Sequence, residues 1–494
     1  MASPSIGRRL ANEFGITTLS KSSRDVYLLL LTRFIRMFAY GSSTLILALY
    51  FATLDFSDQQ IGLFMALTLV GDVAISLVLT LVADALGRRR IMILGALLMT
   101  FSGAVFATAS NYWILLFAAV VGVISPSGNE IGPFRAVEES TIAHLSEAET
   151  RSDVFAWYVV FGTLGTAGGS LASGWATQAL QTVGWSEVAA FRLVFWLYAA
   201  IGLVKATISL GLSPACEAEP PTVREEEHEL DAQGSEQRPM LDDSDDDEQD
   251  VDAPSTKSPT PAPAEKQKKK SRLAIANLSP TSRKTLLKLC ALFSIDSLAS
   301  GMVPGSLVAF FMNRKFALPT GKLGTIISAT AFVSSIGNIL ASSIAKRIGL
   351  IKTMVFTHLP SAIFLALFPL PNSLLLSVVL LVARSSLAAM DQAPRSAFLS
   401  AVVLPEERTA VMGIVNTVKT MSQSAGPLLT GTLAGEGHFW VAFVVAGALK
   451  ASYDVGMLSM FVNTKLEGRA DGKKEGVDGS ANGDGGAGRE RQGR

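Results

Sequence analysis

Ionisable side chains stand near the middle of several long apolar stretches of this sequence. Arg36 and Asp72 do so in its first half, and Asp296, Arg384 and Lys419 in its second half. A charge in hydrocarbon is costly, so residues of this kind are functional candidates by default. A carboxylate in a cavity can bind and release a proton, whereas a fixed cation can hold an anion or neutralise a carboxylate. These residue types therefore indicate proton binding and ion pairing inside a membrane.

Four carboxylates are the candidates for a group that exchanges a proton. Asp72 and Asp296 rank first because they fall near mid-depth of their stretches, and Glu130 and Asp391 rank next. The alternative for each is a permanent salt bridge.

The cations have candidate partners within the same stretches. The pairs are Arg36 with Asp72, Asp296 with Lys419, Arg384 with Asp391 on one helix face, and Lys450 with Asp454 at four-residue spacing. A second group, nearer one end of its spans, could form an ion-pair network at a gate or contact a ligand: Arg33, Glu130, Arg135 and Glu138. Arg36, Arg384 and Lys419 would favour an anionic ligand, but acids and bases are nearly balanced in the spans.

The elements that position these charges are twelve apolar blocks. Charged residues make up only 17% of the 494 residues, against about 25% in a soluble domain. Six blocks cover about 26–51, 61–83, 91–110, 112–137, 152–180 and 191–212, and six more cover about 285–312, 322–345, 351–369, 373–395, 409–433 and 438–462. Each is long enough to cross a bilayer as a helix. The expected fold is an all-α polytopic membrane protein with twelve transmembrane helices.

Lysine and arginine placement predicts the orientation. With the N-terminus in the cytoplasm, the inner loops are basic, and the outer loops at 54–60, 111, 181–190, 370–372 and 434–437 contain neither residue. Arg314, Lys315 and Lys322 are the exceptions to this pattern. We therefore expect a multi-pass protein with both termini cytoplasmic, in a membrane that the sequence does not identify.

A polar segment separates the two sets of blocks. It contains the acidic run DDSDDDEQD at 242–250 and the basic run KQKKKSR at 266–272, and it cannot bury enough apolar area to fold. The expected division is a cytoplasmic tail at 1–25, a six-helix bundle at 26–212, a disordered linker at 213–283, a second six-helix bundle at 284–463 and a disordered tail at 464–494.

The two bundles carry matching patterns. Ala83, Gly87, Arg90 and Met92 align at constant offset with Ala345, Gly349, Lys352 and Met354. EIGP at 130–133 echoes DQAP at 391–394, and ETRS…GSLASG at 149–174 echoes EERT…GPLLTG at 406–431. These repeats predict two pseudo-symmetric halves of parallel origin.

The stretch TLVADALGRRR at 80–90 resembles the signature loop of the major facilitator superfamily. Asp84, Gly87, Arg88 and Arg89 match the family pattern, whereas Thr80 and Val82 replace its usual glycine and leucine. The resemblance implies a cytoplasmic gate in which Asp84 and Arg88 hold this loop against the eleventh span. The alternative is that the arginines only set the orientation.

Glycines in the fifth and eleventh spans form a second, degraded pattern. GTAGGSLASG at 165–174, with Gly165 and Gly169, resembles the helix-kinking motif of drug/proton antiporters, and Gly426–Pro427 repeats its Gly-Pro step. Plain helix packing is the alternative. The resemblance slightly favours export.

Together these features predict a secondary active transporter of a small molecule that works by alternating access and is coupled to protons, with antiport preferred. A uniporter or symporter for an organic anion is one alternative, and a non-transporting membrane sensor or scaffold is another. No phosphate-binding loop, nucleophile–base pair or metal-ligand spacing is present in the sequence. We expect no enzyme activity, cofactor, metal or nucleic-acid partner, and a monomer in the lipid bilayer.

Overall fold

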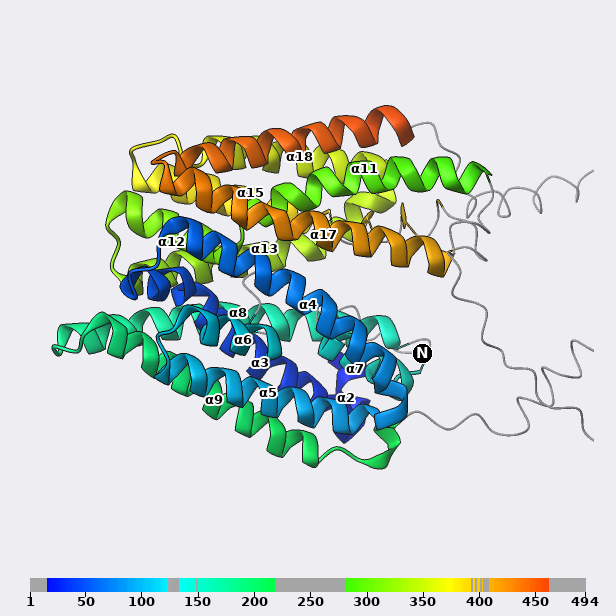
Figure 1. Cartoon of the computed structure of the whole chain (residues 1–494). Helices are drawn as coiled ribbons and strands as arrows, with labels where there is room; N and C mark the ends of the chain where they lie inside the picture. Colours follow the sequence, from blue (N-terminus) through cyan, green and yellow to red (C-terminus); the bar gives the residue numbers. More distant parts are fainter. Residues whose placement is uncertain are drawn as a thin grey trace, which may run out of the picture.

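A computed structural model of the chain describes residues 16–122, 124, 133–147, 150–217, 280–391, 394–395, 398–399, 402 and 408–461. Its ordered elements are helices that run roughly along one axis (Figure 1). Seven of the described helices are long and apolar enough to cross a membrane, and three shorter helices are also apolar.

Among the described residues, the N half contains eight α-helices and a short 3-10 helix. They are α2 (Ile16–Lys21), α3 (Arg24–Thr53), α4 (Asp58–Leu86), α5 (Arg88–Thr108), α6 (Tyr112–Gly122), α7 (Pro133–Leu145), α8 (Arg151–Thr182), α9 (Glu187–Leu210) and η1 (Pro214–Cys216). The C half contains α11 (Pro280–Met302), α12 (Gly305–Phe316), α13 (Thr320–Ile348), α14 (Leu350–Leu367), α15 (Leu374–Ala389), α17 (Arg408–Gly435) and α18 (Phe439–Phe461).

The repeat seen in the sequence is present in the backbone. Gly87 and Gly349 have φ angles of 88° and 90°, and each directly precedes a helix, α5 or α14. This region of backbone space is open to glycine and strained for other residues. The same turn therefore links the second and third spans of each half.

Packing within the halves follows the repeat as well. In the N half α3 packs on α8 and α5 on α9; in the C half α11 packs on α17 and α14 on α18. These pairs occupy equivalent positions in the helix order of each half, which supports two halves with the same helix arrangement.

One predicted span is divided in two. The block at 285–312 was expected to be one helix, but α11 ends at Met302 and α12 begins at Gly305. Pro304 caps α12 with φ −63° and ψ 156°, outside the helical region. Proline lacks an N–H to donate into a continuing helix and constrains the residue before it, which explains the break.

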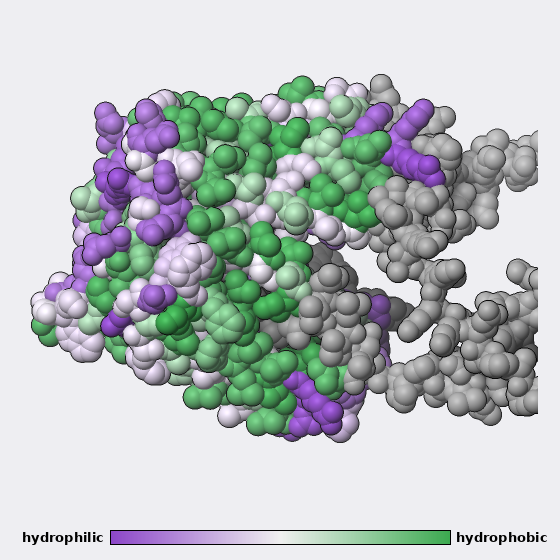
Figure 2. Space-filling view, in the orientation of Figure 1, coloured by the Kyte–Doolittle hydropathy of each residue, from purple (hydrophilic) through white to green (hydrophobic). Residues whose placement is uncertain are grey.

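The molecule has two ends, which we name by their turns. The linker end carries Gly87, Gly211 and Gly349, and the distal end carries the turns at 54–57, 183–186, 317–319 and 436–438. Figure 2 shows apolar side chains over the middle of one face and hydrophilic side chains gathered at the distal end. This is the surface of a protein that spans a bilayer with its ends in water.

The two halves meet closely at the distal end. A Cβ atom on Gly62 of α4 would lie 2.4 Å from the Pro427 carbonyl oxygen of α17, and one on Gly174 of α8 would lie 2.5 Å from the Thr320 oxygen of α13. Toward the linker end α4 and α17 diverge (Figure 1), and a Cβ on Gly413 of α17 would meet nothing within 4 Å. The halves are thus joined at one end and parted at the other.

Candidate functional site

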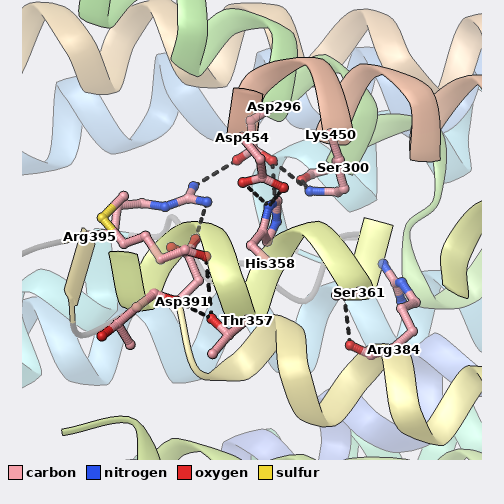
Figure 3. A network of polar contacts seen from close by, with 12 residues as sticks. Asp296, Ser300, Thr357, His358, Ser361, Arg384, Asp391, Arg395, Lys450 and Asp454 are labelled. Atoms are coloured by element: carbon pink, nitrogen blue, oxygen red, sulfur yellow. Dashed lines mark hydrogen bonds and ion pairs between the residues drawn. The ribbon is translucent and has the colours of Figure 1, made fainter. Parts of the chain in front are cut away.

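The buried charges of the C half converge on Asp296 of α11. Its Oδ1 accepts a hydrogen bond of 2.7 Å from Lys450 Nζ of α18, and its Oδ2 accepts one of 2.7 Å from Arg395 Nη1 (Figure 3). Lys450 also donates to Ser300 Oγ at 2.8 Å. Asp296 is only 3% exposed, so contacts with two cations take the place of the water that would hydrate this carboxylate.

A histidine and a second aspartate lie beside this group. His358 Nδ1 of α14 lies 2.9 Å and 3.0 Å from the two carboxylate oxygens of Asp454 on α18, and its Nε2 lies 3.7 Å from Asp296 Oδ1. Both side chains are buried. His358 therefore connects two carboxylates and can carry a proton for either.

Arg395 connects the group to a third carboxylate. One of its guanidinium nitrogens contacts Asp296 and the other contacts Asp391. Its charge also lies 5.4 Å from the ring centre of Phe293 and 5.2 Å from that of Tyr453. We call this assembly the C-half cluster; its members are Asp296, Ser300, His358, Asp391, Arg395, Lys450 and Asp454.

The N half has a smaller cluster centred on Glu138 of α7. Its Oε2 accepts from Arg36 Nη2 of α3 at 2.6 Å and from the Tyr158 hydroxyl of α8 at 2.8 Å, and its Oε1 accepts from Lys205 Nζ of α9 at 3.2 Å. Glu138 is fully buried. We call Arg36, Glu138, Tyr158 and Lys205 the N-half cluster. It joins four helices through one carboxylate.

The predicted site residues lie within the bundles, and their pairing differs from the prediction. Asp296 pairs with Lys450 and Arg395, whereas its expected partner Lys419 lies with Nζ 5.5 Å from the ring centre of Phe293. Lys450 and Asp454 contact different partners, so their expected mutual neutralisation is wrong.

Three other predicted residues are also located. Asp72 is 5% exposed on α4, and Arg384 is half-buried on α15, where its backbone oxygen accepts from Ser361 Oγ at 2.9 Å. Asp391 belongs to the C-half cluster. Glu130 lies outside the described residues, as does the side chain of Asp84.

Several of the residues that complete the clusters were not predicted from the sequence. Lys205 and Arg395 were not selected, and His358 was set aside because it has no metal-ligand companion. Lys205 and His358 lie inside apolar spans, which is a usable signal. Arg395 follows Pro394 just beyond α15, where no helical periodicity marks its face.

The loop at the linker end of the N half is held by a residue that follows η1. The carboxylate of Glu217 accepts from the backbone N–H groups of Arg88 at 2.7 Å and Arg89 at 3.3 Å. Arg89 Nη2 donates to the Leu210 carbonyl at 2.5 Å. Gly87 has no side chain to cap α5. The Glu217 carboxylate therefore accepts from the first N–H groups of α5 and interacts favourably with the positive end of the α5 dipole.

The glycines of the degraded motif serve close packing. A Cβ on Gly165 would lie 2.5 Å from the Phe34 oxygen, one on Gly169 would lie 1.9 Å from the Phe38 oxygen, and one on Gly426 would lie 2.2 Å from the Gly301 carbon. In both halves glycine lets the fifth or eleventh span touch the backbone of the first or seventh. Pro427 lies inside α17 beside Gly426.

Helices with apolar outer faces, charges gathered inside each half and halves that part at one end define an integral membrane carrier. Sequence comparison agrees. A sequence model of the Major Facilitator Superfamily matches residues 29–288 and 289–483, so the chain belongs to this superfamily. It is a membrane transporter and not an enzyme, and the superfamily fold is two six-helix halves.

Known proteins resemble the chain over most of its length. An uncharacterized membrane protein of Saccharomyces cerevisiae, YJR124C, is 34% identical over 444 residues, covering 89% of this chain and 95% of the relative. The nucleoside transporter NupG superposes with a TM-score of 0.63 at 14% identity, covering 89% of this chain and 99% of that one.

Two other solved structures share the fold. The xylose transporter XylE from E. coli, in an inward open conformation, gives a TM-score of 0.60 at 12% identity, covering 90% of this chain and 98% of that one. The human organic anion transporter MFSD10 gives 0.54 at 16% identity, covering 88% and 99%. At these identities the likeness extends to the fold alone.

Proposed function

We propose that this chain is a proton-coupled secondary transporter that moves a small molecule by alternating access. The observation that carries the proposal is the charge balance of the C-half cluster. Three carboxylates, Asp296, Asp391 and Asp454, face two fixed cations, Arg395 and Lys450. A buried cluster is stable only when its charges are compensated. Among the residues in direct contact, one proton would balance the third carboxylate.

His358 and Asp454 are the groups that hold this proton. Asp296 and Asp391 each contact a fixed cation, whereas Asp454 contacts His358. Both the imidazole and the carboxylate can hold the proton, so the pair can take it up on one side of the membrane and release it on the other. Asp72 is the candidate for a second coupling group, in the N half.

The arrangement of the halves supports alternating access. They touch at the distal end through Gly62 and Gly174 and diverge toward the linker end. We infer that the linker end faces the cytoplasm, with both termini and residues 218–279 on that side, because the inner loops are basic. Asp84, Arg88 and Arg89 would then latch this end shut in the opposite conformation, with export and antiport as the preferred mode.

A second candidate function is transport of an organic anion by uniport or symport. Arg384 and Lys419 have no carboxylate at ion-pair distance among the described residues, while the other cations of the C half's interior do. Unpaired cations within a carrier attract anionic cargo.

The test begins by finding the cargo. Purified protein is screened by thermal shift against nucleosides, sugars and organic anions, and a stabilising compound is then loaded into proteoliposomes. The proposal expects concentrative flux when a pH gradient is imposed and exchange alone when the pH is equal on both sides.

Variants assign the proton. Asp454→Asn and Asp72→Asn should lose gradient-driven flux and keep the thermal shift with cargo, because binding does not need the exchanged proton. Asp153→Asn removes a carboxylate outside both clusters, where it accepts from Thr18 at 2.7 Å, and should behave like the unmodified chain. Flux that ignores the gradient in the unmodified chain would favour uniport.

A further inference from the structure

A pocket of about 410 Å³ lies at the distal end of the C half, away from both clusters. It is lined by side chains from the end of α12, the turn between α14 and α15, and the start of α18. Those used below are Phe311, Arg314, Lys315, Pro369, Leu370 and Trp440.

Two of the three cations that break the charge pattern, Arg314 and Lys315, line this pocket. Arg314 and Lys315 form the last turn of α12, whereas the distal turns at 54–57, 183–186, 317–319, 368–373 and 436–438 contain no lysine or arginine. Cations in the last turn of a helix also stabilise its dipole. That effect does not require both of them to line one pocket.

Both cations keep hydrogen-bond donors to spare. Lys315 Nζ donates to the Pro369 oxygen at 2.5 Å and the Pro371 oxygen at 2.7 Å, which leaves one of its three N–H groups. Arg314 Nη1 donates to Asp58 Oδ2 at 2.6 Å, which leaves most of its five. With Asp58 included, the mouth of the pocket carries one net positive charge.

The rim of the pocket is apolar and exposed. Leu370 is 52% exposed and Trp440 46%, and on the adjoining first turn of α15 Leu375 is 74% exposed. In a membrane protein such side chains contact lipid, and tryptophan is typical of the headgroup level. A ligand held here would place an anion at the cations and hydrocarbon beside Leu370 and Leu375.

We propose that this pocket binds the headgroup of an anionic phospholipid from the leaflet at the distal end. The headgroup phosphate contacts Arg314 and Lys315, and its single negative charge matches the net charge of the mouth. The glycerol backbone lies against Phe311 and Trp440, and the acyl chains follow α15. The lining of the pocket includes no member of either cluster, so the test of this proposal does not require the cargo to be known.

Native mass spectrometry tests this. Full-length protein is placed in nanodiscs made of equal parts dioleoyl phosphatidylglycerol and dioleoyl phosphatidylcholine. It is then released from the nanodiscs in the mass spectrometer, and the lipid that stays bound is identified. We expect the anionic lipid to be retained over the zwitterionic one by about fivefold per cation engaged. Arg314→Gln and Lys315→Gln should each reduce that preference by about that factor.

Two controls make the outcome decisive. Lys322→Gln removes the same charge from an exposed side chain at the same end that does not line the pocket, and it should leave the preference unchanged. Glycerol phosphate, which offers the same anion without hydrocarbon, should not displace the lipid. Equal loss in Lys322→Gln, full retention in Lys315→Gln or displacement by glycerol phosphate would each overturn the proposal. Arg314 is 53% exposed, so Arg314→Gln retains the fold if Lys315→Gln does not.

Discussion

The two halves share a backbone plan and differ in what they bury at its centre. The N-half cluster surrounds one carboxylate, Glu138, with Arg36, Lys205 and the hydroxyl of Tyr158. The C-half cluster has three carboxylates, two fixed cations and a histidine. The N-half cluster therefore has one carboxylate for two cations, whereas the C-half cluster has the histidine and the additional carboxylate on which we base the proposed proton exchange.

The comparison extends to equivalent helix contacts. Where α5 meets α9, a Cβ on Gly202 would lie 3.0 Å from the Ala96 oxygen, and where α14 meets α18, a Cβ on Gly447 would lie 2.7 Å from the Ala362 oxygen. The contact between α14 and α18 also holds His358 against Asp454. Close backbone packing is therefore common to both halves, and the C half adds a titratable pair to it.

The largest expected effect separates the clusters by stability. Glu138→Gln leaves Arg36 and Lys205 without the carboxylate between them and should cost about 3–5 kcal/mol in the free energy of unfolding. Asp391→Asn should cost less, about 1–3 kcal/mol, because Arg395 keeps Asp296. Denaturant unfolding in detergent measures both. Equal losses of unfolding free energy in the two variants would contradict the distinction between the N-half cluster and the C-half cluster.

The next largest effect tests whether glycine is required for close helix packing in both halves. Gly426→Ala places a methyl group 2.2 Å from the Gly301 carbon, and Gly169→Ala places one 1.9 Å from the Phe38 oxygen. Each should destabilise by about 1–3 kcal/mol or more through overpacking. Gly413→Ala, also on α17, meets nothing within 4 Å and is the matched control. The account fails here if Gly413→Ala is as harmful as the other two.

A smaller effect concerns the loop at the linker end. Glu217→Gln keeps an acceptor for the N–H groups of Arg88 and Arg89 and removes the charge that faces the start of α5. We expect a loss of about 0.5–1 kcal/mol, screened by salt. Thermal unfolding at low and high ionic strength detects it; a loss that salt does not change would mean that geometry, not charge, holds the loop.

The smallest effect is at the distal contact between the halves. Asp58→Asn weakens its bond to Arg314, whose side chain is 53% exposed, so less than about 1 kcal/mol is expected. The substitution should shift the protein modestly toward conformations in which the distal end is open. The accessibility of cysteines introduced at that end measures this shift. Unchanged accessibility would mean that the bond between Asp58 and Arg314 does not help to close the distal end.

The fold could be predicted from the sequence further than the site could. The signature loop and the repeat at Gly87 and Gly349 depend on local composition; the family match agrees with the first and the backbone with the second. The break at Pro304 was missed because the apolar pattern continues across it.

Ion pairs could not be predicted because each depends on which distant helices become neighbours. Asp296 and Lys450 are 154 residues apart, and Arg36 and Glu138 are 102 apart. Because α11 packs against both α17 and α18, the choice between Lys419 and Lys450 as the partner of Asp296 depends on which side chain faces it in the folded bundle. Burial and charge mark the residues that matter, and the fold decides their partners.

The most direct test of the central claim follows the two halves as the pH changes. Spin labels at Arg151→Cys on α8 and Arg347→Cys on α13, in a chain with Cys216→Ala and Cys290→Ala, report the separation of the halves at the linker end. The account predicts that this distance distribution changes between about pH 5 and 8, the range over which we propose that the coupled pair of His358 and Asp454 exchanges its proton. It predicts that Asp454→Asn abolishes the change and that Asp153→Asn does not. A distance distribution that stays the same across this range in the unmodified chain, or a change that persists in Asp454→Asn, would contradict it.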